Sequence, residues 1–155
     1  MGYSDPLMHT LDKFDHAILN TLQADARITL TALANKVGLS KTPCQIRMKR
    51  LESHGYILGY CARLNHSKLG QNHIAFAQVT LKQTNSQALT IFNQAINMIP
   101  AVEQCHMIAG SFDYLVKVRT RNMEEYRAVL GEKISALPNV LQSSTFVVME
   151  SIKDS

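Results

Sequence analysis

The stretch from Leu30 to Gly55 constrains the fold most, because two amphipathic helical patterns meet in it across a short turn. One apolar stripe at helical spacing consists of Leu30, Leu33, Ala34 and Val37. A second stripe consists of Cys44, Met48 and Leu51. Gly38 follows the first stripe, at a position where many helices end in a left-handed residue, and Ser40 is the expected N-cap of the second helix. The stretch therefore predicts a helix-turn-helix.

The side chains that the second stripe leaves outside are mostly polar or cationic. From Lys41 to Arg50 the sequence has four basic residues and no acidic one. Short polar side chains near a helix N-terminus, with cations further along, suit a helix that enters the major groove of DNA. The alternative is a solvated helix face that happens to be basic. The preceding helix and turn favour DNA binding over that alternative.

The charge of the chain is positive, and most of the excess lies in the half that contains this stretch. The 155 residues carry a formal net charge of +4, with a pI near 9.1. Residues 1–65 contain eight Lys and Arg against five Asp and Glu, a net +3, whereas residues 66–155 contain eight against seven, a net +1. A basic excess of this kind fits contact with nucleic acid but does not require it.

Other kinds of site have little support in the sequence. The three cysteines, Cys44, Cys61 and Cys105, lack CxxC spacing, which argues against a disulfide framework or a zinc cluster and indicates reduced thiols in the cytoplasm. No apolar run approaches the roughly 18 residues of a membrane span, and the N-terminus lacks a signal-peptide pattern. Since we find no catalytic constellation or nucleotide-binding motif, we expect no enzyme, no cofactor and no metal site.

A further helix is predicted before the helix-turn-helix, and a strand after it. Asp12 is placed to cap the first helix, and Asp15 lies in its first turn, where a carboxylate suits the helix dipole. Residues 56–64, YILGYCARL, are rich in β-forming side chains and predict a strand. The polar, glycine-containing residues 65–72 mark the expected domain boundary.

The half of the chain after this boundary alternates between strand and helix patterns. Strands are predicted at residues 73–82, 102–109, 114–120 and 141–150. Helices are predicted at 89–99 and 122–137, each ended by a proline. The order β-α-β-β-α-β is that of a ferredoxin-like fold. Because such a sheet carries helices on one face only, a second copy of the chain is the expected cover of the other face.

Five stretches of the sequence, taken in this order, carry a resemblance to a known family. They are LDKFDHAILNTLQADAR, VGLSKTPCQIRMKRLESHGYILGY, EQCHMIAGSFDYLVKVRT, YRAVLGEKISALPNV and TFVVMESIK. From about Leu11 to Lys153 the chain resembles the Lrp/AsnC, or feast/famine, family of bacterial transcriptional regulators. The resemblance implies an α+β protein: a winged helix-turn-helix in residues 1–64, a linker at 65–72 and a ferredoxin-like effector and oligomerisation domain in 73–155. It also implies homodimers formed through the sheets, which often assemble into octamers.

The resemblance makes the second helix of the helix-turn-helix a recognition helix, from Ser40 to His54. The residues expected near bases or adjacent phosphates are Ser40, Lys41, Thr42 and Gln45. The residues expected to hold phosphates, which positions a protein on DNA without reading its sequence, are Arg47, Lys49 and Arg50. For Arg47 the alternative is that its aliphatic stem packs across the apolar stripe.

The loop from Gly110 to Tyr114, GSFDY, resembles the effector-binding turn of the family. On its residues alone this loop predicts only a hairpin turn. Backbone N–H groups at a glycine suit a carboxylate, and Asp113 suits an ammonium group, which together fit an α-amino acid. The resemblance implies an effector site that includes Gly110, Ser111, Asp113 and Tyr114, with Met123, Phe146, Val147 and Val148 near an apolar pocket. Apolar residues at the last four positions would equally serve as core.

The resemblance also bears on the effector. The general family type suggests leucine, whereas KTPCQIRMKRLE and CHMIAGSFDYL look closer to members that control proline utilisation, and so to an activator. We therefore expect an amino-acid-responsive regulator that binds double-stranded DNA.

Two other classes of protein are alternatives to a ligand-responsive regulator. One is an architectural, nucleoid-associated DNA-binding protein without a ligand response. The other is a small enzyme or an enzyme's regulatory subunit, which the basic helix and the missing catalytic groups disfavour.

Overall fold

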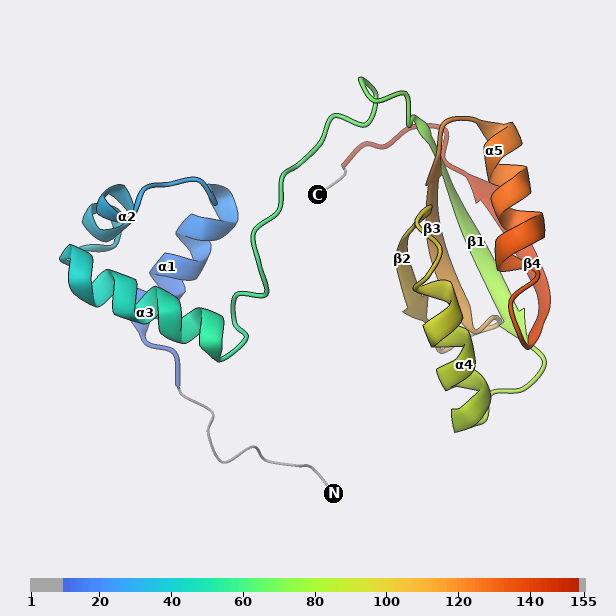
Figure 1. Ribbon diagram of the computed structural model, residues 1–155, viewed down its shortest axis with the longest axis horizontal. Helices are drawn as coiled ribbons and strands as arrows, with labels where there is room; N and C mark the ends of the chain where they lie inside the picture. Colours follow the sequence, from blue (N-terminus) through green and yellow to red (C-terminus); the bar gives the residue numbers. More distant parts are fainter. Residues whose placement is uncertain (1–9, 154–155) are drawn as a thin grey trace. The chain divides into compact units, whose positions relative to one another are not determined.

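The computed structural model describes residues 10–153. The chain divides into two compact units, of which one ends at Arg63 and the other begins at Leu64 (Figure 1). Each unit has its own hydrophobic core, built from residues of that unit alone. Among the described residues, no helix has the length and apolar character needed to cross a lipid bilayer.

The first unit is a bundle of α1 (Lys13–Ala24), α2 (Leu30–Val37) and α3 (Lys41–Ser53) (Figure 1). Its core contains most of both predicted stripes together with α1 side chains: Ile18, Leu22, Leu33, Ala34, Val37, Cys44 and Leu51, with Leu30 and Met48 partly buried against it. Burial of the stripes is what holds the three short helices together, since helices of this length are marginal on their own. The predicted helix-turn-helix is confirmed.

The helix ends follow the predicted capping, with one exception. The backbone N–H groups of Phe14 and Asp15 donate to the Asp12 carboxylate at 2.8 and 3.0 Å, and the Asp15 carboxylate accepts from the Asp12 N–H at 3.2 Å. This reciprocal arrangement starts α1. Gly38 ends α2 in the left-handed conformation, with φ of 74°. Ser40 occupies the N-cap position of α3, but its side chain makes no capping hydrogen bond, so that part of the prediction is wrong.

The strand predicted at residues 56–64 is not formed. This segment has no regular secondary structure, and Leu58 and Tyr60 are 96% and 50% exposed. A strand is stable only where a neighbour accepts and donates its backbone hydrogen bonds. No strand of the described chain pairs with this segment, so its β-forming residues are not sufficient to make it a strand.

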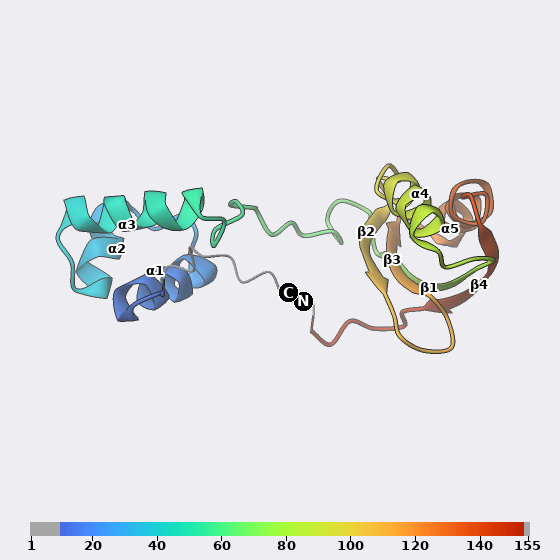
Figure 2. The same ribbon diagram turned by 90° about the horizontal axis from the view of Figure 1, so that it is seen from below.

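The second unit is a four-stranded antiparallel sheet in the order β2-β3-β1-β4. The strands are β1 (His73–Leu81), β2 (Val102–Met107), β3 (Tyr114–Thr120) and β4 (Val140–Val147). The helices α4 (Ser86–Ile96) and α5 (Met123–Ala128) cover one face of the sheet, as the two views in Figures 1 and 2 show. The β-α-β-β-α-β order and the ferredoxin-like topology are confirmed.

The second predicted helix departs from a regular α-helix after its first turns. It continues as a π-helical segment, Val129–Ile134, in which Ser135 N–H donates to Leu130 C=O at 2.7 Å. Val129 and Ile134 are both buried although they are five residues apart. The wider turn of a π-helix suits that spacing, because its hydrogen bonds join residues five apart. Apolar periodicity alone did not distinguish the two helix types.

One face of the sheet packs against the helices and the other lacks a cover within the unit. Alternate residues of β1, among them Ala75, Ala77 and Val79, are fully buried beneath the helices. On the opposite face Phe76 pairs in register with Phe146, and Phe146 is 52% exposed. We call this face, with its aromatic pair, the open sheet face.

Candidate functional site

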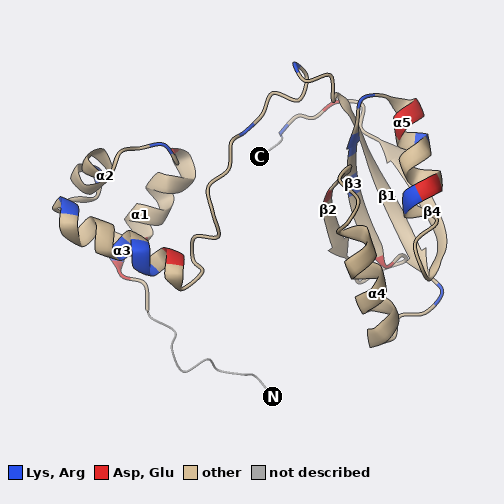
Figure 3. Cartoon of the chain, in the orientation of Figure 1, with Lys and Arg blue, Asp and Glu red and all other residues tan. Residues whose placement is uncertain are grey.

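The exposed side of α3 carries most of the residues predicted to meet DNA. Figure 3 shows Lys and Arg at the start of α3 and again along its second half. The predicted contact residues with exposed side chains are Ser40, Lys41, Thr42, Gln45 and Lys49. Positions three and four apart lie on one side of a helix, so Thr42, Gln45 and Lys49 share a face. Burial of Cys44 and Leu51 in the core turns that face outward.

Ile46 belongs to the same exposed face, although it is not among the contact residues expected from the sequence. It lies one turn after Thr42 and is 62% exposed, although isoleucine is usually buried. The available signal was its absence from the apolar stripe of α3. On a helix that enters the major groove, an apolar side chain of this kind is suited to the methyl group of thymine.

Arg47 and Arg50 are directed toward the N-terminus of α1 and are held there by carboxylates. Arg47 Nη1 lies 2.6 Å from Asp12 and 2.9 Å from Asp15. Arg50 Nη2 donates to both carboxylate oxygens of Asp15, at 2.8 and 2.7 Å. The Arg47 guanidinium also lies over the Phe14 ring, 5.4 Å from its centroid. The side chain of Asp15 is only 1% exposed. We refer to these two arginines and two aspartates as the α1–α3 ion cluster.

The cluster favours the charged forms of Asp12 and Arg47. The Asp15 backbone N–H, followed by the Arg47 side chain, lowers the pKa of the Asp12 carboxyl, although partial desolvation opposes the shift. Asp12 and then Asp15 raise the pKa of Arg47. A carboxylate as enclosed as Asp15 is stable only if it is paired. Its partners Arg47 and Arg50 are 24% and 37% exposed, so losing one of them costs less than breaking a fully buried ion pair. The cluster therefore ties α3 to α1.

In the second unit, the predicted effector loop is anchored at Asp113 and open at its tip. The Asp113 carboxylate accepts from the Leu81 N–H at 2.7 Å, and the Asp113 N–H donates to Val79 C=O at 3.0 Å. Gly110 and Ser111 are exposed. An ionised carboxylate has room for several donors, so the bond to Leu81 leaves Asp113 with acceptor capacity.

A single chain does not bring the predicted effector residues together. The loop lies beside the end of β1, where Tyr114 pairs with Val79, whereas Val147 pairs with Ala75 toward the start of β1. At about 3.3 Å per residue these two positions are about 13 Å apart along the strand. The predicted effector residues thus fall into two groups, one at each end of β1. Met123 follows the end of β3 that pairs with His73, so it belongs to the group near the start of β1. The residues of that second group are Met123, Phe146, Val147 and Val148.

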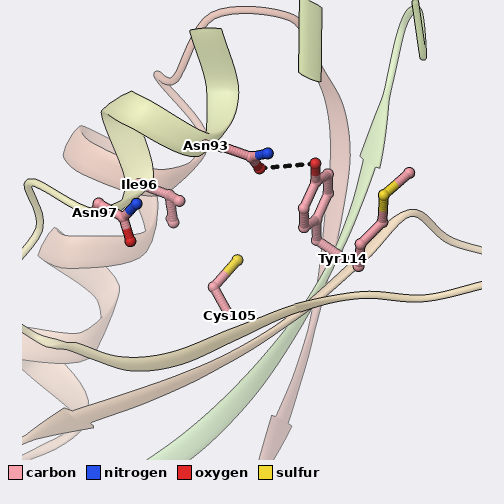
Figure 4. Close-up of a pocket in the computed structure, with 6 residues that line it drawn as sticks. Asn93, Ile96, Asn97, Cys105 and Tyr114 are labelled. Carbon is pink, nitrogen blue, oxygen red and sulfur yellow. Dashed lines mark hydrogen bonds between the residues drawn. The ribbon is translucent and has the colours of Figure 1, made fainter. Parts of the chain in front are cut away.

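Tyr114 lines a cavity on the helix-covered side of the sheet. The Tyr114 side chain is 2% exposed, and its hydroxyl donates to Asn93 Oδ1 at 2.8 Å (Figure 4). The cavity has a volume of about 290 Å³, and its lining is Asn93, Ile96, Asn97, Cys105, Met107 and Tyr114. Burial raises the pKa of the Cys105 thiol, which keeps it protonated and poorly nucleophilic. The one signal of this cavity in the sequence is a pair of asparagines four residues apart, Asn93 on α4 and Asn97 at its C-cap.

Metal binding has no geometric support in the part of the chain that the structure describes. Within residues 10–153, no group of three or more His, Cys, Asp or Glu side chains is arranged to hold an ion. The three cysteines are free thiols; Cys44 is buried, Cys61 is exposed and Cys105 is half-buried.

Comparison with known proteins adds to this geometry. Residues 74–155 match the family model of the Lrp/AsnC ligand binding domain, and residues 11–57 match that of a winged helix-turn-helix DNA-binding domain. A proline dehydrogenase transcriptional activator of Rhizobium radiobacter is 58% identical over 144 residues, which cover 93% of this chain and 92% of the relative. The leucine-responsive regulatory protein of Escherichia coli strain K12 is 43% identical over 145 residues, covering 94% and 88%.

Solved structures agree with these sequence matches. A transcriptional regulator of Neisseria meningitidis in complex with L-Met superposes with a TM-score of 0.87 at 29% identity, covering 94% of each chain. An AsnC family transcriptional regulator of Agrobacterium tumefaciens gives the same TM-score, identity and coverage. The named relatives regulate transcription, which confirms that the chain is a DNA-binding regulator rather than an enzyme.

Proposed function

Because this chain belongs to the Lrp/AsnC family of transcriptional regulators, we propose that it activates a gene of amino-acid catabolism in response to a proline- or leucine-type effector. The observation that carries the proposal is the 58% identity to a proline dehydrogenase transcriptional activator over nearly the full length of both chains. The identity to a leucine-responsive regulator is lower, at 43%, which favours proline. A protein that regulates a bacterial gene must reach duplex DNA, so this proposal includes a cytoplasmic location for the chain.

The DNA interface that we propose is the exposed face of α3. Thr42, Gln45 and Lys49 lie on this face, and none of their side chains is part of the buried core. Thr42 and Gln45 are of the types that read base edges, and Lys41 and Lys49 are of the type that neutralises phosphates. Ser40 joins them because its hydroxyl is not used as a helix cap.

The effector site that we propose begins at the tip of the loop between β2 and β3. The exposed backbone at Gly110 and Ser111 offers N–H groups to a carboxylate, and Asp113 offers an acceptor to an ammonium group. An α-amino acid carries both groups. The relative solved with L-Met supports a ligand of this class.

A homodimer formed through the open sheet face, and from it an octamer, is part of the proposal. Two features support it. The face carries the exposed Phe146, and large exposed apolar side chains on a sheet favour association. The two groups of predicted effector residues lie at different ends of β1, so residues of a second copy are needed to complete a site that contains both. Residues 65–72 serve as the linker between the two units.

The test combines ligand binding with DNA binding on the full-length protein. Calorimetry with proline, leucine and methionine should give heat with proline or leucine, and the same compound should change the mobility shift of the chain's own upstream DNA. Lys49→Ala should reduce the slope of log K against log salt by about 0.9 for each DNA-bound helix-turn-helix. Lys82→Ala, an exposed charge of the second unit, is the matched control. DNA binding that no amino acid alters would instead indicate the architectural alternative.

A further inference from the structure

We propose that Asp12 and Asp15 are positioning residues for DNA binding, which hold Arg47 and Arg50 away from the phosphates and leave Lys41 and Lys49 as the phosphate-contacting cations of α3. This proposal rests on the docking of α3 against DNA. It replaces the expectation that all four basic residues of α3 act on the duplex.

The positive and negative charges within the α1–α3 ion cluster balance. Two guanidinium groups face two carboxylates at distances of 2.6 to 2.9 Å, so the four side chains together carry no net charge. A neutral group releases few counterions from DNA, because release follows the net positive charge brought to the phosphates. By contrast, no ion pair among the described residues involves Lys41 or Lys49, and both side chains are exposed.

The two arginines should bind the carboxylates of the cluster in preference to DNA phosphates. Asp15 is almost fully enclosed, and both of its carboxylate oxygens accept from Arg50. If Arg50 turned toward a phosphate, an enclosed carboxylate would lose its principal partner, which is strongly unfavourable. A phosphate at the protein surface is an exposed partner whose attraction is screened by salt. The pairs within the chain should therefore persist when DNA is bound.

The ion cluster also restricts the orientation of α3 against α1. Asp12 and Asp15 form the capping box at the start of α1, and the same two side chains hold α3 by contacts across 32 to 35 residues of sequence. Guanidinium groups donate in a fixed planar fork, so paired bonds of this kind restrict the orientation of one helix against the other. Asp12 and Asp15 thereby act on DNA indirectly, by setting how the face with Thr42 and Gln45 is presented.

The experiment measures how the affinity for a mixed-sequence duplex of about 30 base pairs depends on KCl, with the full-length protein. Asp12→Asn removes one negative charge, while asparagine remains a good N-cap for α1. Arg47 keeps its 2.9 Å contact with Asp15, but the cluster then carries a net charge of +1, which should strengthen binding and steepen the salt slope by up to about 0.9 per bound domain. A merely structural role of Asp12 predicts weaker binding with an unchanged or shallower slope, and that result would overturn the proposal.

A charge-matched variant makes the test independent of the stability of the single mutant. Asp12→Asn combined with Arg47→Met removes one charge of each sign, so the proposal predicts the wild-type salt slope. If Arg47 held a phosphate, the double variant would lose about 0.9 of slope, as Lys49→Ala should. Lys49→Ala also separates the two proposals: an unchanged slope in that variant rejects the docking of α3 itself, whatever the aspartate variants do.

Discussion

At the scale of single residues, side chains that are close in sequence on α3 lie in different environments. Gln45 and Lys49 face outward from α3, whereas Arg47, which lies between them in sequence, is bound to carboxylates of α1. Cys44 is buried in the core. We therefore expect a basic residue of α3 to contact DNA only if no carboxylate of its own chain already pairs with it.

Ile46 supports a prediction at this scale. We expect Ile46→Ala to weaken binding to an operator by about 1 kcal/mol, the value of roughly one buried methylene, if Ile46 meets a thymine methyl. Replacing the operator's thymines by uracil should lower the affinity of the wild-type protein. The affinity of the Ile46→Ala variant should be the same for both operators. Fluorescence anisotropy measures both at one salt concentration.

The control for this prediction is Ile152→Ala, which truncates another isoleucine that is 86% exposed, and it should leave the affinity unchanged. The salt slope of the Ile46 variant should also stay at the wild-type value, because no charge is removed. Equal sensitivity of variant and wild type to uracil would place Ile46 away from thymine methyl groups.

At the scale of elements, the turn between α2 and α3 decides whether two helices become a helix-turn-helix. Gly38 adopts φ of 74°, and the Leu39 N–H donates to Ala34 C=O at 2.9 Å, which ends α2 and turns the chain toward α3. A residue with a Cβ is strained in this conformation. A Cβ at Gly38 would meet no atom within 4 Å, so the requirement for glycine comes from the backbone alone.

We predict that Gly38→Ala destabilises the first unit by about 1–2 kcal/mol, the cost of a left-handed conformation for an L-residue. The matched control is Gly131→Ala, where a Cβ also meets no atom within 4 Å but φ is not positive. That substitution should be neutral, or stabilising by up to about 1 kcal/mol, because it reduces the entropy of the unfolded chain. Thermal unfolding followed by circular dichroism distinguishes them, and equal losses would exclude backbone strain as the cause.

At the scale of the whole molecule, each unit has its own acidic residue with a lowered pKa. In the first unit this is Asp12, whose carboxyl accepts the Asp15 N–H and pairs with Arg47. In the second unit Glu103 is one of two such residues, the other being Glu125 beside Arg121; burial by itself would raise the pKa of Glu103, but the hydrogen bond from Arg119 and the charges of Arg119 and Lys117 outweigh burial. Asp12 and Glu103 therefore stabilise the folded chain in their ionised form.

This gives a prediction for acid stability. A carboxyl with a lowered folded-state pKa contributes stability above its unfolded-state value and loses that contribution as the pH falls through the folded-state pKa. Both units should therefore lose thermal stability as the pH drops below about 4, from unfolded values near 3.8 for Asp12 and 4.5 for Glu103. Glu103→Gln should flatten the acid limb of the second unit's melting temperature, and an unchanged limb would show that its ion pairs contribute nothing.

What could be predicted from the sequence was local. The stripe of Cys44, Met48 and Leu51, the capping by Asp12 and the glycine turn depend on residues within one or two helical turns, and periodicity reports them. The strand order of the second unit followed because its helices and strands alternate in a pattern that few topologies accommodate.

The remaining features depend on partners that are distant in sequence. The pairing of Arg47 with Asp12 and Asp15 was not predicted, because these carboxylates are 35 and 32 residues away, beyond the reach of any local pattern. Residues 56–64 have β-forming side chains, but a strand needs a neighbour, and the described chain supplies none. Composition and spacing thus predicted most of the helices and strands, whereas tertiary packing decided which charged side chains are paired within the chain and which stay exposed.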